Sequence, residues 1–218
     1  MSTVVSLFSG CGGSDFGLHQ AGYEILMAND ILPYARDVYL ANLPFTDFRL
    51  GDIAKIQNFP KADLLVGCYP CQGFSQGGVR DASRKINQLY KEFERALIQI
   101  KPKAFIVENV SGMRRADFRH LLDDQVIRFS AAGYKVKFEV LDARKYGVPQ
   151  ERQRLFIVGI RDDQDFEYEF PKPAFEEDSY VTIRQAIGDL PEWPEGEYNN
   201  ETFHWYYLSR NRIGRAHV

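Results

Sequence analysis

The chain has 218 residues, of which 44% are hydrophobic and 26% charged, a composition typical of globular proteins and unlike that of disordered ones. No stretch approaches about 18 consecutive apolar residues, and no basic segment precedes the first apolar run. Neither a membrane span nor a secretory signal is therefore predicted. The three cysteines are too few for a disulfide framework in a chain of this length, which favours a reducing, cytoplasmic location.

The net charge of −3 hides an uneven distribution. Residues 72–159 carry a net charge of +7, whereas residues 160–201 carry a net charge of −10. A basic central region could face a polyanion such as a nucleic acid. Scattered, solvated charges explain the same counts, so the charge alone leaves both interpretations open.

Short apolar runs alternate with longer amphipathic stretches, which predicts repeated βαβ units. We expect strands at residues 3–8, 23–28, 63–68, 104–108, 135–141 and 155–160, and helices at residues 14–21, 33–42, 88–100 and 115–132. Several of these strands are apolar almost throughout, so the fold class is α/β, with a mostly parallel sheet and helices on both faces. Beyond residue 160 the sequence turns acidic, and only residues 181–190 indicate a short helix.

Ligands of such sheets bind at the carboxyl ends of the strands. Unusual segments follow four of the predicted strands: Ser9–Gly13, Asn29–Asp30, Tyr69–Gln72 and Glu108–Asn109. Glycines in the first segment allow positive φ angles and the close approach of a ligand, and the amides that open the next helix favour an anionic group. The spacing is not G-x-G-x-x-G, so a dinucleotide is not specifically indicated, and a plain tight turn is the alternative.

Two acidic residues indicate a nucleoside. Asp30 lies about twenty residues after the glycines, where a carboxylate can accept hydrogen bonds from both hydroxyls of a ribose. Asp52 could accept a hydrogen bond from an adenine amino group. Either residue could equally cap a helix. Together with the glycine turn, the two acids favour an adenosine-containing cofactor.

Cys68 and Cys71 form a C-x-x-C sequence that allows three interpretations. It resembles a thiol–disulfide motif, it could be half of a zinc site that lacks a second paired cluster, or one cysteine is a nucleophile on a loop. The glycine-rich sequence after Cys71 does not suit a thioredoxin-type helix and is typical of a loop that closes on a substrate. We therefore favour Cys71 as a nucleophile and keep an oxidoreductase as a distant alternative.

Glu108 ends a buried strand, where a carboxyl group is costly unless it has a partner. Partial burial is expected to raise its pKa, which suits a proton donor, and a structural salt bridge is the alternative. Gln150, Arg152 and Arg154 would share one face of an extended chain. From that face they can contact a carbonyl group and phosphates, but on a solvent-facing edge the same pattern carries no function.

At these residues the sequence resembles the bacterial DNA cytosine-5 methyltransferases. The matching segments follow the order of the family across residues 3–160: Phe8–Gly13, Asp30, Gly51–Ile53, Pro70–Gln72 with Phe74–Ser75, Glu108–Val110, and Gln150, Arg152 and Arg154. The resemblance implies a Rossmann-like methyltransferase fold and a cytoplasmic bacterial enzyme that acts on double-stranded DNA. It also implies S-adenosylmethionine as the methyl donor, S-adenosylhomocysteine as the product, and no metal.

The resemblance further implies roles for individual residues. Cys71 would add to C6 of a cytosine flipped out of the duplex, and Glu108 would engage N3 and the exocyclic amine. Arg154, with Arg152, would hold O2 and the adjacent phosphates. Cofactor binding falls to Phe8, Ser9, Gly10, Gly12, Gly13, Asp30, Ile31, Asp52, Ile53, Pro70 and Leu89. Contacts to DNA fall to Gln72, Ser75, Arg80, Asn109 and Gln150.

The sequence departs from the family pattern after residue 160. We expect residues 1–160 to form the catalytic and cofactor-binding domain, and residues 161–218 an acidic, proline-containing extension that leads into a target-recognition region. The RE-containing segment and the G-N-[SA] motif of the family are not found. A subunit completed by a second polypeptide, a shortened chain and a frameshifted remnant all fit, as does self-association through exposed apolar surface. The competing function is a catalytically incomplete module that binds nucleic acid or assembles with a partner; action on RNA is a minor branch.

Overall fold

The computed structural model describes residues 1–70 and 88–189, together with the strand residues 198–199 and 204–205. The chain divides into two compact units. Unit 1 comprises residues 1–140 and 154–170, and unit 2 comprises residues 141–153 and 171–218. In the described part of the chain, no helix has the length and apolar character needed to cross a membrane.

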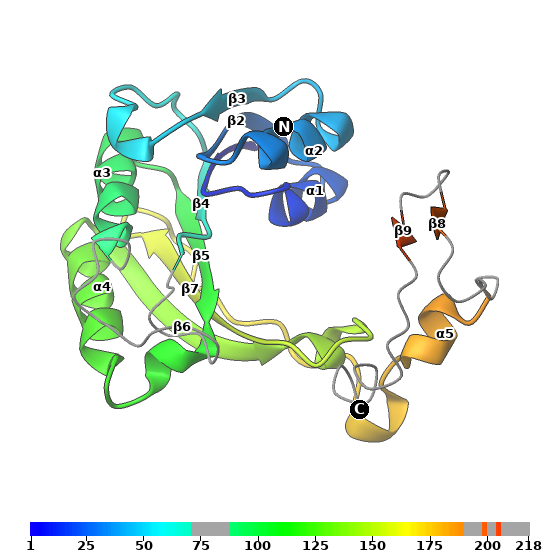
Figure 1. The fold of residues 1–218 in the computed structure, drawn as a ribbon. Coiled ribbons are helices and arrows are strands. Elements are labelled where there is room, and N and C mark those ends of the chain that lie inside the picture. Colours follow the sequence, from blue (N-terminus) through cyan, green and yellow to red (C-terminus); the bar gives the residue numbers. More distant parts are fainter. Residues whose placement is uncertain (71–87, 190–197, 200–203, 206–218) are drawn as a thin grey trace. The chain divides into compact units, whose positions relative to one another are not determined.

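Unit 1 is built on a seven-stranded sheet with the strand order β3-β2-β1-β4-β5-β7-β6 (Figure 1). The strands are β1 (Thr3–Leu7), β2 (Glu24–Asp30), β3 (Asp47–Leu50), β4 (Leu64–Gly67), β5 (Ala104–Val110), β6 (Tyr134–Asp142) and β7 (Gln153–Arg161). The β1–β2, β2–β3, β1–β4 and β4–β5 pairs are parallel, and the β5–β7 pair is antiparallel. This is the Rossmann-like, mostly parallel α/β fold that the sequence predicts.

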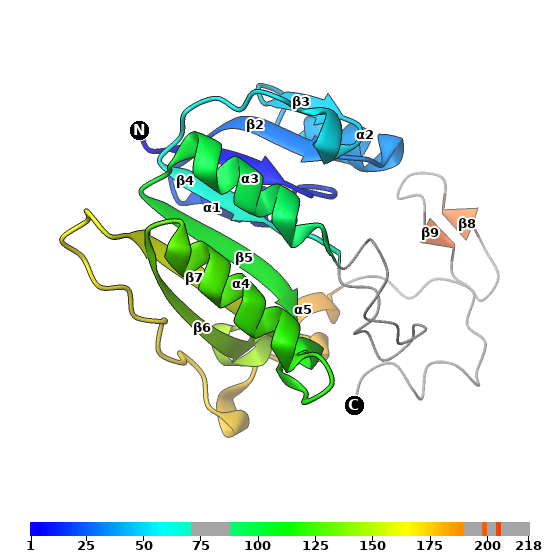
Figure 2. The ribbon, with the colours of Figure 1, turned by 90° about the vertical axis from the view of Figure 1, so that its left-hand side faces the viewer.

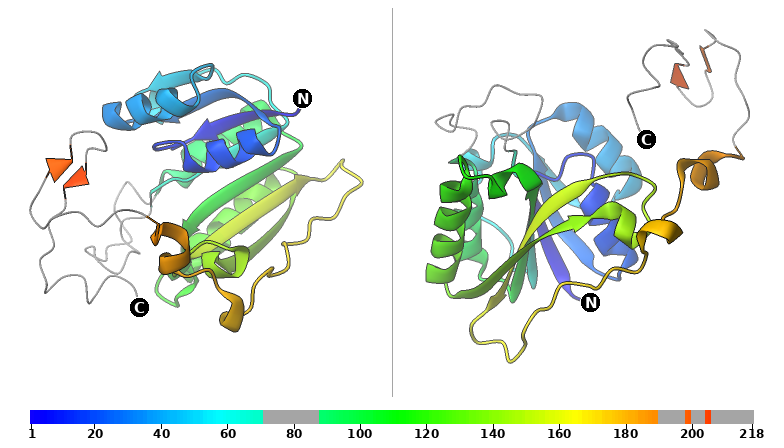
Figure 3. Two further views of the ribbon diagram at one scale, coloured as in Figure 1. Left: turned by 90° about the vertical axis from the view of Figure 1, so that its right-hand side faces the viewer. Right: turned by 90° about the horizontal axis from the view of Figure 1, so that it is seen from below.

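Helices cover both faces of this sheet. On one face lie α3 (Tyr90–Ile100) and α4 (Arg119–Ala131), which stand in front of the strands in Figure 2. On the other face lie α1 (Gly13–Gln20) and α2 (Pro33–Asn42), as both views of Figure 3 show. The main core lies between α3, α4 and the sheet, where the fully buried rings of Phe93, Phe105 and Phe129 meet edge to face at centroid distances of 5.1–5.8 Å.

Shorter elements complete both units. They are the 3-10 helices η1 (Ile53–Lys55), η3 (Ser111–Arg114), η4 (Ala143–Tyr146) and η5 (Glu177–Ser179), the helix α5 (Ile183–Ile187), and the strands β8 (Tyr198–Asn199) and β9 (His204–Trp205). Within unit 2, Arg144 forms an ion pair with Asp142 at 2.7 Å and stacks over the ring of Tyr180. The side chains of Thr182 and Gln185 cap the start of α5 reciprocally.

All six predicted strands and five predicted helices are present, with ends shifted by up to four residues. Strand β3 was not predicted from the sequence. Its sequence DFRL alternates polar and apolar residues, but four residues are too few to stand out, and none of them is buried at this edge of the sheet. Strand β1 ends one residue earlier than expected, because Phe8 adopts a left-handed conformation with φ of 57°. The expected extended run through Gln150, Arg152 and Arg154 is wrong in part. A tight turn, in which the Gln150 N–H donates to the Val148 carbonyl, precedes β7, so only Arg154 lies in the strand.

Candidate functional site

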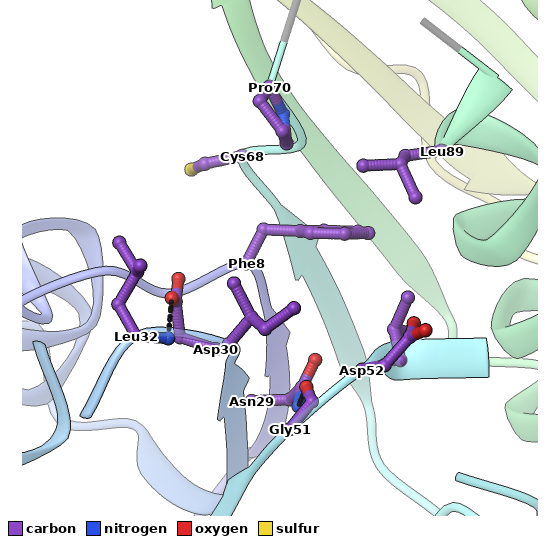
Figure 4. Close-up of a pocket in the computed structure, with 11 residues that line it drawn as sticks. Phe8, Asn29, Asp30, Leu32, Gly51, Asp52, Cys68, Pro70 and Leu89 are labelled. Carbon is purple, nitrogen blue, oxygen red and sulfur yellow. Dashed lines mark hydrogen bonds between the residues drawn. The ribbon is translucent and has the colours of Figure 1, made fainter. Parts of the chain in front are cut away.

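A pocket of about 390 Å³ lies at the carboxyl ends of β1, β2, β3 and β4 (Figure 4). Its volume lies within the range of small-molecule sites, about 300–1,000 Å³. Its lining residues end or follow those strands, or precede α3: Phe8, Asn29, Asp30, Ile31, Leu32, Gly51, Asp52, Ile53, Cys68, Pro70 and Leu89. Seven of the eleven predicted cofactor residues are among them: Phe8, Asp30, Ile31, Asp52, Ile53, Pro70 and Leu89.

Apolar side chains form much of the pocket wall. The ring of Phe8 extends across the middle of the pocket in Figure 4, and the edge of Tyr69 supports it at a centroid distance of 5.9 Å. Phe8 has φ of 57°, which is uncommon for a residue other than glycine. Backbone strain of this kind concentrates at functional sites. Ile31 remains 63% exposed. The flat ring of Phe8 and the apolar side chain of Ile31 suit contact with a planar aromatic base.

Asp30 connects two segments of the pocket rim. Its Oδ2 accepts a hydrogen bond from the Gly10 N–H at 2.9 Å, and its Oδ1 accepts one from the Leu32 N–H at 3.0 Å, the dashed line in Figure 4. The carboxylate therefore joins the glycine turn after β1 to the start of α2. Each carboxylate oxygen can accept more than one hydrogen bond, so Asp30 can still receive ligand hydroxyls.

Asp52 caps a short helix, which is one of the two roles that the sequence left open, and it also lines the pocket. Its Oδ1 accepts a hydrogen bond from the Ala54 N–H at 3.0 Å, so it caps the short helix η1. It also lines the pocket, and its side chain is exposed there. A cap and a ligand contact are compatible because a carboxylate has two oxygens.

The remaining predicted cofactor residues, Ser9, Gly10, Gly12 and Gly13, lie in the turn from β1 to α1 and are not among the described residues that line this pocket. Gly12 has φ of 87°, and a Cβ there would come within 2.8 Å of the Tyr39 ring. Only glycine fits this position without strain.

A buried acid lies beneath the glycine turn, and sequence reasoning missed it. Asp15 in α1 is fully buried and accepts hydrogen bonds from the hydroxyls of Ser6 at 2.7 Å and Tyr39 at 2.8 Å. Burial raises the pKa of Asp15, and these hydrogen bonds oppose the rise. The signal in the sequence was weak, since an acid in the first turn of a helix is usually exposed and interacts with the helix dipole.

The predicted catalytic acid and one predicted arginine meet at the ends of β5 and β7. Arg154 Nε lies 2.9 Å from Glu108 Oε1, and both side chains are more than a quarter exposed. The structural salt bridge named as the alternative for Glu108 is therefore present. Next to it, buried Asn109 donates a hydrogen bond from Nδ2 to the carbonyl of Tyr69 at 3.3 Å, which ties β5 to the segment before Cys71 in the sequence.

Cys68 lines the pocket and is half-buried. Burial raises the pKa of its thiol to about 12, and the nearby Glu108 carboxylate adds to the rise. A thiol in this environment stays protonated at neutral pH and is a poor nucleophile. Among the described residues, no group of three or more His, Cys, Asp or Glu side chains could hold a metal ion.

Four predicted site residues lie outside the described residues: Cys71, Gln72, Ser75 and Arg80. Arg152 and Gln150 belong to unit 2. There, Gln150 lines a separate pocket of about 400 Å³ together with Arg144, Thr182 and Arg184.

Comparisons with known proteins agree with the pattern of these residues. The family model for C-5 cytosine-specific DNA methylases matches residues 2–217. The type II methyltransferase M.BspRI of Lysinibacillus sphaericus is 39% identical over 96% of the chain and 57% of its own length. M.BsuRI of Bacillus subtilis is 36% identical over 96% of the chain and 55% of its own length. The chain thus spans little more than half the length of these relatives.

A solved structure of similar fold comes from a prophage of E. coli, and its title describes a DNA modification methyltransferase. It superposes with a TM-score of 0.77 at 26% sequence identity, over 91% of this chain and 57% of its own. The Dnmt2 methyltransferase of S. pombe aligns with a TM-score of 0.58 at 19% identity, over 78% of this chain and 51% of its own, and shows the fold alone.

Proposed function

Because the chain belongs to the family of C-5 cytosine-specific DNA methylases, we propose that it transfers a methyl group from S-adenosylmethionine to C5 of a cytosine in double-stranded DNA, in the bacterial cytoplasm. The observation that carries this proposal is the single pocket that gathers seven of the eleven residues expected to hold the cofactor. Pro70, which precedes Cys71 in the sequence, is one of the seven. The pocket and the Glu108–Arg154 pair both belong to unit 1.

The chemistry of the pocket fits an adenosine. Asp30 would accept hydrogen bonds from the ribose hydroxyls, and Asp52 would accept one from the adenine amino group. Phe8, Ile31 and Ile53 would enclose the base, with Pro70 and Leu89 at the other wall. The turn of Ser9, Gly10, Gly12 and Gly13 would face the methionine end. S-adenosylmethionine, when bound, supplies a methyl group on a positively charged sulfur.

Cys71 would provide the nucleophile. Its thiolate would donate an electron pair to C6 of the cytosine, forming an S–C6 bond and moving electron density to C5, which takes the methyl group. Transfer of the C5 proton to water would return the C5–H electron pair to the ring, break the S–C6 bond and release Cys71 as a thiolate. Glu108 would hold N3 and the exocyclic amine, with a proton that neutralises charge on the ring.

The pair of Glu108 and Arg154 would separate when cytosine binds, because each residue has a proposed partner on the base. An ion pair between side chains that remain partly exposed is worth about 0–1 kcal/mol, so its exchange is inexpensive. Arg154, with Arg152, would then contact O2 and neighbouring phosphates. The remaining contacts to the flipped nucleotide and the DNA backbone would come from Gln72, Ser75, Arg80, Asn109 and Gln150.

The resemblance assigns the nucleophile to Cys71 rather than Cys68, and the environment of Cys68 supports this choice. Burial raises the pKa of the Cys68 thiol to about 12, so it stays protonated at neutral pH. Residues 1–160 would contain this machinery, and residues 161–218 would lead into the region that reads the DNA sequence.

The test is covalent trapping on DNA that contains 5-fluorocytosine, which cannot lose a proton from C5. With S-adenosylmethionine present, we expect a trapped adduct for the wild type and for Cys68→Ser, and none for Cys71→Ser. Equal loss in both variants would show that the nucleophile is wrongly assigned. Cofactor binding without trapping, restored by a second polypeptide, would instead indicate a module that needs a partner to act.

A further inference from the structure

Asn29 lies at the end of β2 in the wall of the pocket and is 1% exposed. Its side-chain Nδ2 donates two hydrogen bonds, one to the Arg49 carbonyl at 2.7 Å and one to the Gly51 carbonyl at 3.0 Å. Carbonyl groups only accept, so the amide can face them in one orientation only, with nitrogen toward both. The Asn29 amide is therefore committed to the backbone at the end of β3 and in the turn that follows it.

This contact lies at the junction between β3 and the turn that carries Asp52. Strand β3 has four residues, stands at the edge of the strand order and pairs with β2. After it, Gly51 turns the chain with φ of 138°, and its N–H donates to the Asp30 carbonyl at 2.9 Å. Asp52 comes next, and its exposed side chain lines the pocket beside the start of η1 (Figure 4).

The turn is held from both ends. Asn29 holds the start at Gly51, and Arg95 from α3 holds the end by donating to the Ile53 carbonyl at 2.9 Å. Asp52 lies between these two attachments. A shift of the Gly51 carbonyl would move the Asp52 carboxylate directly, because the two residues are joined by one peptide bond.

We infer that Asn29 is a positioning residue that sets the recognition of the adenine amino group by holding the Gly51–Asp52 turn against the pocket. This inference rests on the proposed function, because it takes the ligand to be an adenosine derivative. Asn29 acts through Asp52 and needs no contact with the reacting atoms. A chain without this clamp should still enclose a purine but should distinguish its 6-substituent poorly.

The test compares two ligands by calorimetry: S-adenosylhomocysteine, and S-inosylhomocysteine, which carries a carbonyl oxygen in place of the amino group. The wild type should prefer the adenosine compound at least about tenfold, the range for a hydrogen bond to a charged acceptor. In Asn29→Ser the preference should fall to about twofold or less. Affinity for the inosine compound should change little.

Two further variants control the result. Asn29→Ala removes both N–H donors without placing a charge against the two carbonyl groups, so it should lose the preference as well, and it serves if Asn29→Ser does not fold. Asn42→Ser removes an exposed amide at the end of α2, away from the pocket, and should keep the wild-type preference. A purely structural role for Asn29 would lower both affinities by the same factor and leave their ratio unchanged, which would overturn the inference.

Hydrogen exchange without ligand tests the clamp independently. In Asn29→Ser the amides of Gly51 and Ala54 should exchange faster, while the amides of β5 should keep their protection. Unchanged exchange at the turn would overturn the inference. A wild type that binds both ligands equally would overturn it too, while the proposed function would stand. A folded wild type that binds neither ligand would overturn the proposed function itself, and exchange would still decide whether Asn29 holds the turn.

Discussion

Replacing Tyr39 by phenylalanine should destabilise unit 1, and more so at neutral pH than in acid. Tyr39 is fully buried, and its hydroxyl is one of the donors to the buried carboxylate of Asp15, at 2.8 Å. Ser6 provides another at 2.7 Å. The variant keeps the ring and its packing but leaves a buried charge with one donor fewer. The hydrogen bond, rather than a cavity, therefore determines the cost.

The pH dependence follows from the direction of the pKa shift. Burial raises the pKa of folded Asp15 above its usual 3.8, so its protonation stabilises the fold below pH 3.8, and this contribution is lost as the pH rises through the folded-state value. The Tyr39 hydroxyl lowers the folded-state pKa of Asp15, so removing it enlarges the loss at higher pH. Hydrogen bonds to charged groups are worth about 1.5–3 kcal/mol and neutral ones about 0.5–1.5 kcal/mol. We expect a cost of about 2–3 kcal/mol near pH 8 and about 1 kcal/mol near pH 4.

Urea unfolding at the two pH values measures this difference. Tyr34→Phe is the matched control, because Tyr34 lies on the same helix and is 65% exposed. Its free energy of unfolding should change by less than about 0.5 kcal/mol at either pH. A cost for Tyr39→Phe that is equal at both pH values, or larger in acid, would refute the assignment of an ionisable, buried Asp15.

Three further predictions concern stability and activity. Gly12→Ala should lower the free energy of unfolding by about 1–3 kcal/mol, and by more than Gly22→Ala does. Both glycines have φ of 87°, but only a Cβ at Gly12 would meet a ring, that of Tyr39, at 2.8 Å. Thermal unfolding of the two variants measures the difference. Hydrogen bonds from Lys103 and Thr3 lower the pKa of Asp63 to about 2. Ionised Asp63 therefore stabilises the fold above pH 3.8, and this stabilisation is lost as the pH falls toward 2. Asp63→Asn should remove this part of the pH dependence in an acid titration followed by circular dichroism. Glu108→Gln should lower methyl transfer at least about 100-fold while S-adenosylhomocysteine affinity, measured by calorimetry, stays within about twofold, because Glu108 is not among the described residues that line the pocket.

The elements that the sequence predicted well are those with strong apolar runs or clear periodicity. Helix α3 places Phe93, Leu97 and Ile100 on one buried face, and β4 is buried along its whole length. Strand β3 has only four residues and none of them is buried, so its alternation of polar and apolar residues is too short to be recognised, and its position depends on pairing with β2. Likewise, the turn before β7 depends on a backbone hydrogen bond from Gln150, and no pattern of side chains predicts it.

For the candidate site, the sequence identified the side chains that face the pocket better than those that hold them. Asp30 and Asp52 follow strands and carry an evident chemistry, so the motif pattern revealed them. Asn29 and Asp15 act on neighbouring backbone or on buried hydroxyls, and their role depends on partners about twenty residues away in the chain that only the fold brings together. Spacing along the chain does not encode such contacts.

The division of the proposed machinery between the units separates two questions that one activity assay would merge. Every described residue that lines the cofactor pocket belongs to unit 1, as do Glu108 and Arg154. Arg152 and Gln150, with their proposed DNA contacts, belong to unit 2. Under the proposed function, binding of S-adenosylhomocysteine would therefore depend on contacts within one compact unit, whereas methyl transfer would require groups from both. If the chain bound the cofactor but did not methylate DNA, the failure would lie in binding DNA. The predictions for Asn29 and Asp52 could then still be tested, because they concern ligand binding alone.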